Sequence, residues 1–228
     1  LNSLKTVVND FVPDVSSHIY VQGNHDAEIG TQGLAESGNN DPASGEYGVF
    51  VINEDDYMWY NTDKQRIMAT AENLADYLNE KLVAGFDNPI FVLSHLPLNK
   101  SYRTTMDGDA KYANYLFHVL NQAGEQGLNI IFMYGHDHSS GYDSYLGGSA
   151  VYLAKGDSIN IPQGDANVFR AETLNFTYMN AGYVGYYAKH IITDESESYI
   201  RYVGDYKFYD DGAEVYLLNY IGNETEIT

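Results

Sequence analysis

The stretch Gly135-His136-Asp137-His138 follows an apolar run, NIIFMY, over residues 129–134. A short apolar run of this kind predicts a buried β-strand, and the glycine at its end permits a sharp turn. Because His136 and His138 are two residues apart, an extended or turned backbone projects them toward one place. Two neutral imidazoles so placed suit Zn, Fe, Mn or a similar divalent ion. His-x-His also occurs by chance on solvated loops, so this pair alone leaves both interpretations open.

Two further apolar runs upstream end in residues of the same kind. Gly23-Asn24-His25-Asp26 follows the run 18–21, and Ser94-His95 follows the run 89–93. Segments with helical period lie between these runs, as in a β-α-β chain. Ligands in such folds sit at the carboxyl ends of the strands. We therefore expect the three turns to meet at one edge of a sheet and to form a metal site there.

In this order the three motifs resemble those of the calcineurin-like metallophosphoesterases, which hydrolyse phosphate esters at a two-metal centre. The resemblance is specific between Gly23 and His138 and general beyond them. It implies that one metal is held by Asn24, His95 and His136, and that His138 holds the other.

The resemblance also assigns the chemistry of the second motif. It implies that His25 contacts the phosphate and protonates the leaving oxygen, and that Asp26 orients His25. In the loop after His95, Arg103 would clamp a phosphate or a substrate carboxylate, or else pair with a surface carboxylate. Tyr142, shortly after His138, would lie at the rim of the pocket. His118 lies in a predicted helix beside apolar residues, so we assign it a structural role.

The match to the family is incomplete. The family pattern begins with Asp-x-His and Gly-Asp-x-x-Asp ahead of the Gly23 motif, and neither occurs in this chain. Those motifs supply further ligands, including the carboxylate that bridges the metals. We therefore expect a C-terminal fragment of a longer enzyme, with a partner-completed site or a degenerate relative as alternatives. Two divalent ions (Mn, Fe, Zn or similar) are expected in the intact enzyme, and at most one, bound weakly, in this chain.

The pattern predicts an α/β (α+β) fold, and the resemblance implies a two-sheet β sandwich flanked by helices, here without its N-terminal strands. We expect one partial domain over residues 1–228. Its β-α part, 1–138, carries the motifs, with helices predicted at 1–11, 65–83 and 109–122, a strand at 47–52 and a long loop up to Glu46. Its mainly antiparallel part, 139–228, completes the second sheet with runs at 151–154, 173–180, 183–192, 199–203 and 213–220. The missing strands would leave sheet edges that a dimer partner or the N-terminal segment covers.

The formal net charge of −20 argues against binding to a nucleic-acid backbone. It permits a phosphoester substrate only if bound cations invert the local field. No run is long and apolar enough for a membrane span, and there is no cysteine for a disulfide or a thiolate site. The composition leaves localisation open, with a lean toward a secreted or cell-surface bacterial protein. The alternative function is a non-catalytic module that binds protein or glycan through an acidic, Tyr-rich surface.

Overall fold

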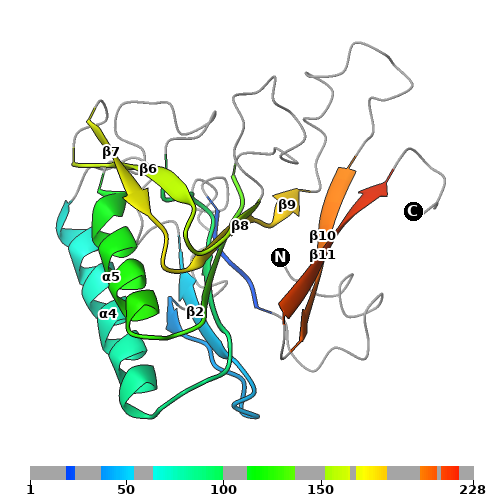
Figure 1. Cartoon of the computed structure of the whole chain (residues 1–228), viewed down its shortest axis with the longest axis horizontal. Coiled ribbons are helices and arrows are strands. Elements are labelled where there is room, and N and C mark those ends of the chain that lie inside the picture. The colour runs from blue at the N-terminus through cyan, green and yellow to red at the C-terminus, as the bar shows by residue number, and fades with distance from the viewer. Residues whose placement is uncertain are drawn as a thin grey trace.

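The computed structural model describes residues 19–23, 37–53, 64–99, 112–136, 152–164, 168–183, 201–209 and 212–220. The fold is mixed α/β, with one six-stranded sheet, two smaller sheets and two helices in this described part (Figure 1). No helix in these ranges is long and apolar enough to cross a membrane.

The six-stranded sheet has a parallel centre and antiparallel edges. Its strands, in spatial order, are β1 (Gly38–Asn39), β2 (Gly48–Ile52), β3 (Ile90–Ser94), β4 (Ile130–Tyr134), β8 (Thr177–Asn180) and β5 (Tyr152–Leu153). The strands β2, β3, β4 and β8 are parallel, and β1 and β5 pair antiparallel at either side. The last residues of the parallel strands therefore form one row across the carboxyl edge of the sheet, and that row consists of Ile52, Ser94, Tyr134 and Asn180.

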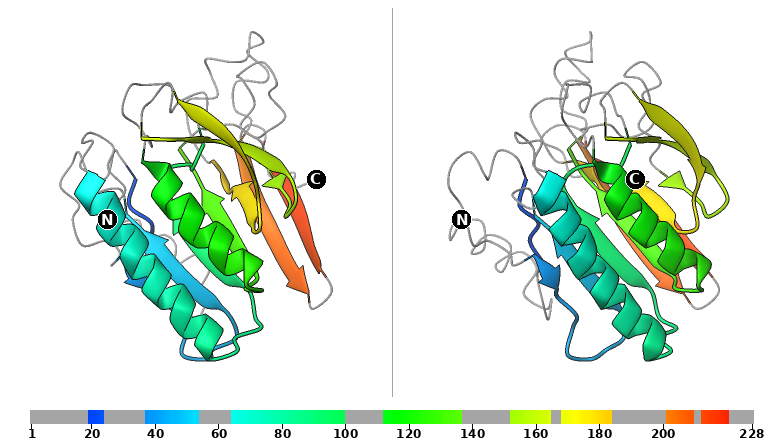
Figure 2. Two further views of the ribbon diagram at one scale, coloured as in Figure 1. Left: turned by 60° about the vertical axis from the view of Figure 1, so that its left-hand side comes forward. Right: turned by 90° about the vertical axis from the view of Figure 1, so that its left-hand side faces the viewer.

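Two helices cover one face of this sheet. α4 (Lys64–Val83) and α5 (Ala113–Glu125) connect successive parallel strands and lie side by side on that face (Figures 1 and 2). Apolar residues at helical spacing, such as Leu74 and Leu78 on α4, are buried in one cluster with Val92 and Phe132 of the sheet. The helix predicted at 65–83 is thus confirmed, as are the strands predicted at 47–52, 89–93 and 129–134, the second of which extends one residue further, to Ser94.

The second helix ends later than the sequence predicts. The prediction ended it at residue 122, but Gly124 lies inside α5 and the helix continues to Glu125. Two backbones approach closely at this glycine: a Cβ atom on Gly124 would lie 2.2 Å from the carbonyl oxygen of Asn175. Glycine is therefore required here for packing, because any side chain would push the turn before β8 off the helix.

The run predicted at 173–180 is divided between two strands, because β7 (Phe169–Thr173) ends at its first residue and β8 begins at Thr177. β7 pairs with β6 (Ser158–Pro162), which was not predicted, in a separate two-stranded antiparallel sheet. The chain then turns at Leu174. The Leu174 N–H donates to the Asp157 carbonyl, and the Leu174 side chain is buried in the core. After this turn β8 pairs parallel to β4. Together with β5 it extends the first sheet, which corrects the expectation that this part completes a second one.

The chain enters another sheet directly after β8. β9 (Gly182–Tyr183), β10 (Arg201–Tyr209) and β11 (Gly212–Tyr220) form a three-stranded antiparallel sheet in the order β11-β10-β9. In Figures 1 and 2 this sheet lies on the side of the six-stranded sheet away from the helices. The antiparallel runs predicted near 199–203 and 213–220 are confirmed, and β10 is longer than predicted.

Two other predictions differ from the structure or lie outside it. Residues 19–21 were expected to be part of a strand, but they have no regular secondary structure. The next residue, Gln22, donates its backbone N–H to the Asn53 side-chain oxygen Oδ1, which is not a β-ladder bond. The loop expected up to Glu46 contains the short strand β1. The helix predicted at 1–11 lies outside the described residues.

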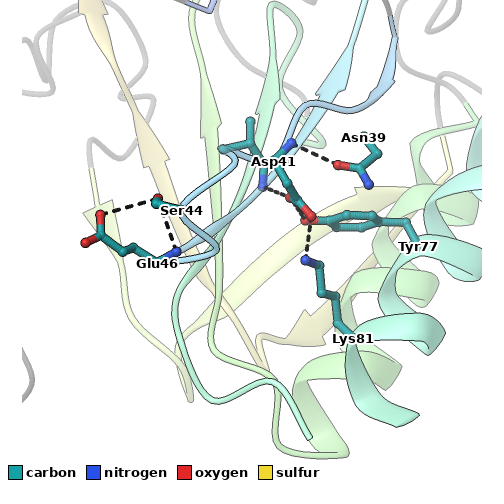
Figure 3. A network of polar contacts seen from close by, with 7 residues as sticks. Asn39, Asp41, Ser44, Glu46, Tyr77 and Lys81 are labelled. Carbon is teal, nitrogen blue, oxygen red and sulfur yellow. Dashed lines mark hydrogen bonds and ion pairs between the residues drawn. The ribbon is translucent and has the colours of Figure 1, made fainter. Parts of the chain in front are cut away.

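A polar network fixes the amino edge of the sheet to α4 (Figure 3). Asp41 Oδ1 accepts from the Val49 N–H at 2.7 Å and from the Tyr77 hydroxyl at 2.7 Å, and Asp41 Oδ2 lies 2.5 Å from Lys81 Nζ. Burial raises the pKa of the Asp41 carboxyl, but the hydrogen bonds from Lys81, Val49 and Tyr77 outweigh burial and leave that pKa below its usual value. Burial, together with the bond to Asp41, raises the pKa of Tyr77, so both groups keep their ordinary charge at neutral pH.

Candidate metal centre at the carboxyl edge of the sheet

Two of the predicted ligands meet at the carboxyl edge. His95 follows β3 and His136 lies two residues beyond β4, which is the neighbouring parallel strand. His95 Nε2 and His136 Nδ1 are 3.2 Å apart, and the two rings meet edge to face with centroids 5.1 Å apart. The two backbones are also joined, because the Gly135 N–H donates to the His95 carbonyl at 3.1 Å. Parallel pairing thus brings together side chains that are 41 residues apart in sequence.

This separation fits shared coordination of one ion. Two nitrogens that each lie about 2.1 Å from an ion are about 3.0–3.4 Å apart when the angle at the ion is about 90–110°. The 3.2 Å between His95 Nε2 and His136 Nδ1 falls in that range. The same distance suits an N–H···N hydrogen bond in which one ring donates. The pair can therefore be hydrogen-bonded when free, and the proton between the two nitrogens must leave before both can bind a metal.

His136 is held in a strained backbone conformation. Its φ is 61°, in the left-handed region, and it is the non-glycine residue with positive φ in the described part of the chain. Left-handed geometry costs an L-residue about 1–2 kcal/mol. Such strain persists where the surrounding structure enforces it, and it concentrates at functional sites. The turn is therefore less stable than an unstrained one, and its geometry holds the buried His136 ring against His95.

The third predicted turn reaches the same place. A Cβ atom on Gly23 would lie 3.0 Å from both Cε1 and Nδ1 of His95, so the Gly23 backbone packs directly on the His95 ring. Asn24, the next residue in the chain, is the third ligand that the sequence predicts for this metal. The structure therefore brings the segment before Asn24, the end of β3 and the end of β4 to one point.

The buried polar side chains of the described part mark this edge independently. All of them except Thr70, on α4, lie at the carboxyl ends of the strands or on the segment before Asn24: Gln22, Asn53, Ser94, His136 and Asn180. Burying a polar side chain costs free energy unless it finds a partner. The Ser94 hydroxyl is buried and has no hydrogen-bond partner among the described residues. A concentration of such groups at one edge is typical of a binding site and not of a packing core.

Sequence reasoning missed most of this buried polar set. Asn53 directly follows a predicted strand, and Asn180 is the last residue of a predicted run, so the pattern that identified His95 would also have identified these two. Ser94 was quoted as part of the Ser-His motif, but the motif gave its hydroxyl no role. Gln22 carries no comparable pattern, since a glutamine before a Gly-Asn motif is unremarkable on a surface turn.

The other predicted site residues lie outside the described residues: Asn24, His25, Asp26, Arg103, His138 and Tyr142. Their roles stay predictions. Among the described residues, no three His, Asp or Glu side chains gather closely enough to hold an ion together, so this part of the chain contributes the His95–His136 pair.

Comparison with known proteins does not place the chain in a family. A scan against models of protein families found no match, and a search of curated proteins found none either. The fold and the geometry of the site are therefore the basis for the function proposed below.

Proposed function

We propose that this chain carries part of the active site of a metal-dependent phosphoester hydrolase of the calcineurin-like type. The single observation that carries the proposal is the contact between His95 and His136. Their nitrogens are 3.2 Å apart, one ring is held by a strained backbone, and the residue before Asn24 packs on the other ring. A φ of 61° at a buried non-glycine residue is uncommon, which favours a functional role for the pair over a chance contact.

The residues divide into ligands and groups that act on the substrate. His95 and His136, together with Asn24, would hold one divalent ion, and His138 would contribute to a second. When bound, the ions supply Lewis-acid activation of water and neutralise charge on the phosphoryl oxygens.

The remaining steps belong to side chains of this chain. His25 would donate a proton to the leaving oxygen, and Asp26 would keep the His25 imidazole in the tautomer that donates. Arg103 would bind two oxygens of the substrate with two parallel N–H donors, and Tyr142 would contact the substrate at the rim of the site. Because the net charge is −20, an anionic ester would be repelled without cations at this edge, which makes activity strictly dependent on metal.

The two-sheet sandwich is part of the same proposal. On the face of the six-stranded sheet opposite the helices, Val49, Val51 and Ile131 are buried although they are not part of the helix-side cluster. Apolar residues there require a second covering layer. The β9–β10–β11 sheet lies on that side in Figure 1 and would supply it.

Calorimetric titration of the metal-free chain with Mn²⁺, and separately with Zn²⁺, tests the proposal. We expect at most one ion per chain, bound weakly, because this chain lacks the family's aspartate motifs. His95→Ala and His136→Ala should each abolish that binding. His118→Ala is the matched control, because His118 is an exposed histidine on α5, away from the edge.

Two results would overturn the metal site: binding that survives both edge substitutions, or binding that is lost equally in His118→Ala. Hydrolysis of bis(p-nitrophenyl) phosphate with Mn²⁺ present tests the reaction itself. We expect slow turnover that disappears in His25→Ala while the metal affinity of that variant is retained. Turnover that continues without added metal and in the presence of a chelator would contradict the proposed chemistry.

A further inference from the structure

Tyr178 is a polar residue within the buried apolar core. The residue lies in the middle of β8 and is fully buried. Its ring stacks on Tyr134 at 4.7 Å and on Phe132 at 5.6 Å between centroids, so its position is fixed by β4. Packing alone would be served equally well by phenylalanine, because a buried hydroxyl must find partners to offset its desolvation.

The partners of this hydroxyl lie on the segment that follows His95. The Leu98 N–H donates to the Tyr178 oxygen at 3.1 Å, and the Tyr178 hydroxyl donates to Asn99 Oδ1 at 2.5 Å. β8 is not adjacent to β3, since β4 lies between them. The hydroxyl therefore reaches past one strand to hold the chain that leaves the end of β3.

This contact fixes the chain on the far side of a proposed metal ligand. On the near side His95 is held by β3, and its carbonyl accepts from the Gly135 N–H. On the far side Leu96 and Leu98 are buried in the core, and the last two residues of the segment 96–99 are hydrogen-bonded to the Tyr178 hydroxyl. With both sides fixed, the His95 ring has little freedom to leave its place between Gly23 and His136.

We propose that Tyr178 is a positioning residue for this site: its hydroxyl fixes the segment 96–99 and thereby holds the His95 imidazole against His136. The positioning of His95 does not depend on the proposed function. The expected consequence, tighter metal binding, does rest on it. Groups that orient metal ligands typically change metal affinity by about 10–100-fold when they are removed. We place Tyr178 at the lower end, because it acts through three residues of backbone.

The test compares two buried tyrosines that each lose one hydroxyl. Tyr178→Phe removes the bonds to Leu98 and Asn99, and Tyr77→Phe removes the bond to Asp41 at the opposite edge. Asn99→Ala removes the same contact from the loop side and serves if Tyr178→Phe does not fold. Two readouts are needed: the imidazole ¹⁵N–¹H correlation spectrum of the metal-free protein, and the dissociation constant for Mn²⁺.

We expect Tyr178→Phe and Asn99→Ala to shift the His95 and His136 imidazole signals and to weaken Mn²⁺ binding about tenfold. Tyr77→Phe should leave both readouts unchanged, even where it lowers the melting temperature as much. If wild type binds no Mn²⁺ and the imidazole signals still shift in Tyr178→Phe, the positioning role stands and the proposed function fails. If the signals and the affinity of Tyr178→Phe and Asn99→Ala match wild type, the positioning role is refuted whatever the metal does.

Discussion

The two edges of the six-stranded sheet use polar groups in opposite ways. At the amino edge, the Asp41 carboxylate receives a backbone N–H, a hydroxyl and an ammonium group. At the carboxyl edge, two imidazoles meet edge to face, one of them on a left-handed backbone, and the buried Ser94 hydroxyl has no partner among the described residues. The polar groups of the amino edge have hydrogen-bond partners within the chain, whereas the carboxyl edge keeps a strained residue and a buried hydroxyl without a described partner.

The difference separates stability from function. A fully bonded network between a loop and a helix stabilises the fold and leaves no group available for chemistry. Strain and incompletely bonded groups reduce stability, so they persist where another requirement maintains them. Substitutions at the amino edge should therefore change stability and leave metal binding intact. Substitutions at the carboxyl edge should weaken metal binding and have smaller effects on stability.

The largest effect is expected at His136. Removing the imidazole in His136→Ala or His136→Gly should weaken Mn²⁺ binding at least 100-fold, since one ligand of a small set is lost. The two variants should differ in stability. Alanine keeps the left-handed strain at φ of 61°, whereas glycine adopts this geometry freely, so His136→Gly should be more stable than His136→Ala by about 1 kcal/mol. Urea unfolding of both variants measures this difference, and equal stabilities would show that the backbone is not strained.

Two glycines offer a matched pair across the edges. A Cβ atom on Gly48 would lie 2.5 Å from the Tyr77 hydroxyl oxygen, and one on Gly23 would lie 3.0 Å from the His95 ring. Gly48→Ala should displace Tyr77 from Asp41 and lower the free energy of unfolding by about 1–3 kcal/mol, with metal affinity unchanged. Gly23→Ala should displace the His95 ring and weaken metal binding, with a smaller loss of stability. If both variants lose the same property, the proposed division between the edges is wrong.

Much of the central fold was predictable because the parallel strands are buried. Continuous apolar runs such as the one before Gly135 identify β3 and β4, and the apolar stripe of α4 identifies the helix between β2 and β3. The rule that ligands lie at the carboxyl ends of parallel strands then placed His95 near His136. That prediction needed only that the strands be parallel and end at one edge, and in the structure the two side chains are in contact.

The parts that were not predictable depend on contacts between distant segments. No local pattern shows that Gly124 must stay inside α5 to admit Asn175, or that β8 joins the sheet beside β4. Tyr178 reads as an ordinary strand residue, because its role depends on a loop 80 residues away in sequence. Tertiary contacts of this kind override local propensity, and they are absent from any short window of sequence.

A smaller effect is expected at Asp41, and it should depend on pH. Asp41→Asn removes the charge that Lys81 faces and weakens the bonds from Tyr77 and Val49, so stability should fall by about 1–2 kcal/mol at neutral pH. The pKa of Asp41 is lowered in the folded state, so its contribution is present above the ordinary pKa of 3.8 and is lost as the pH falls through the lower, folded value.

Urea unfolding of wild type and Asp41→Asn at pH 7 and in acid tests this dependence. The difference between the two proteins should be largest at pH 7 and should shrink below pH of about 4, where the unfolded-state carboxyl binds its proton. A difference that is constant over this range would mean that the Asp41 charge contributes nothing and that only its shape matters. Mn²⁺ affinity, measured in parallel, should be the same for both proteins.

The smallest effect is expected at an ion pair away from both edges. On β7, Arg170 Nε lies 3.1 Å from Glu172 Oε1 but not in hydrogen-bond geometry, and the Arg170 side chain is 70% exposed. Water can replace so exposed a partner, so Arg170→Ala should change the free energy of unfolding by less than about 0.5 kcal/mol and leave metal affinity unchanged. This variant shows whether charge alone explains the Asp41 result. If Arg170→Ala costs as much as Asp41→Asn, the larger effect at the amino edge does not come from its combined hydrogen bonds, and the contrast between the edges loses its physical basis.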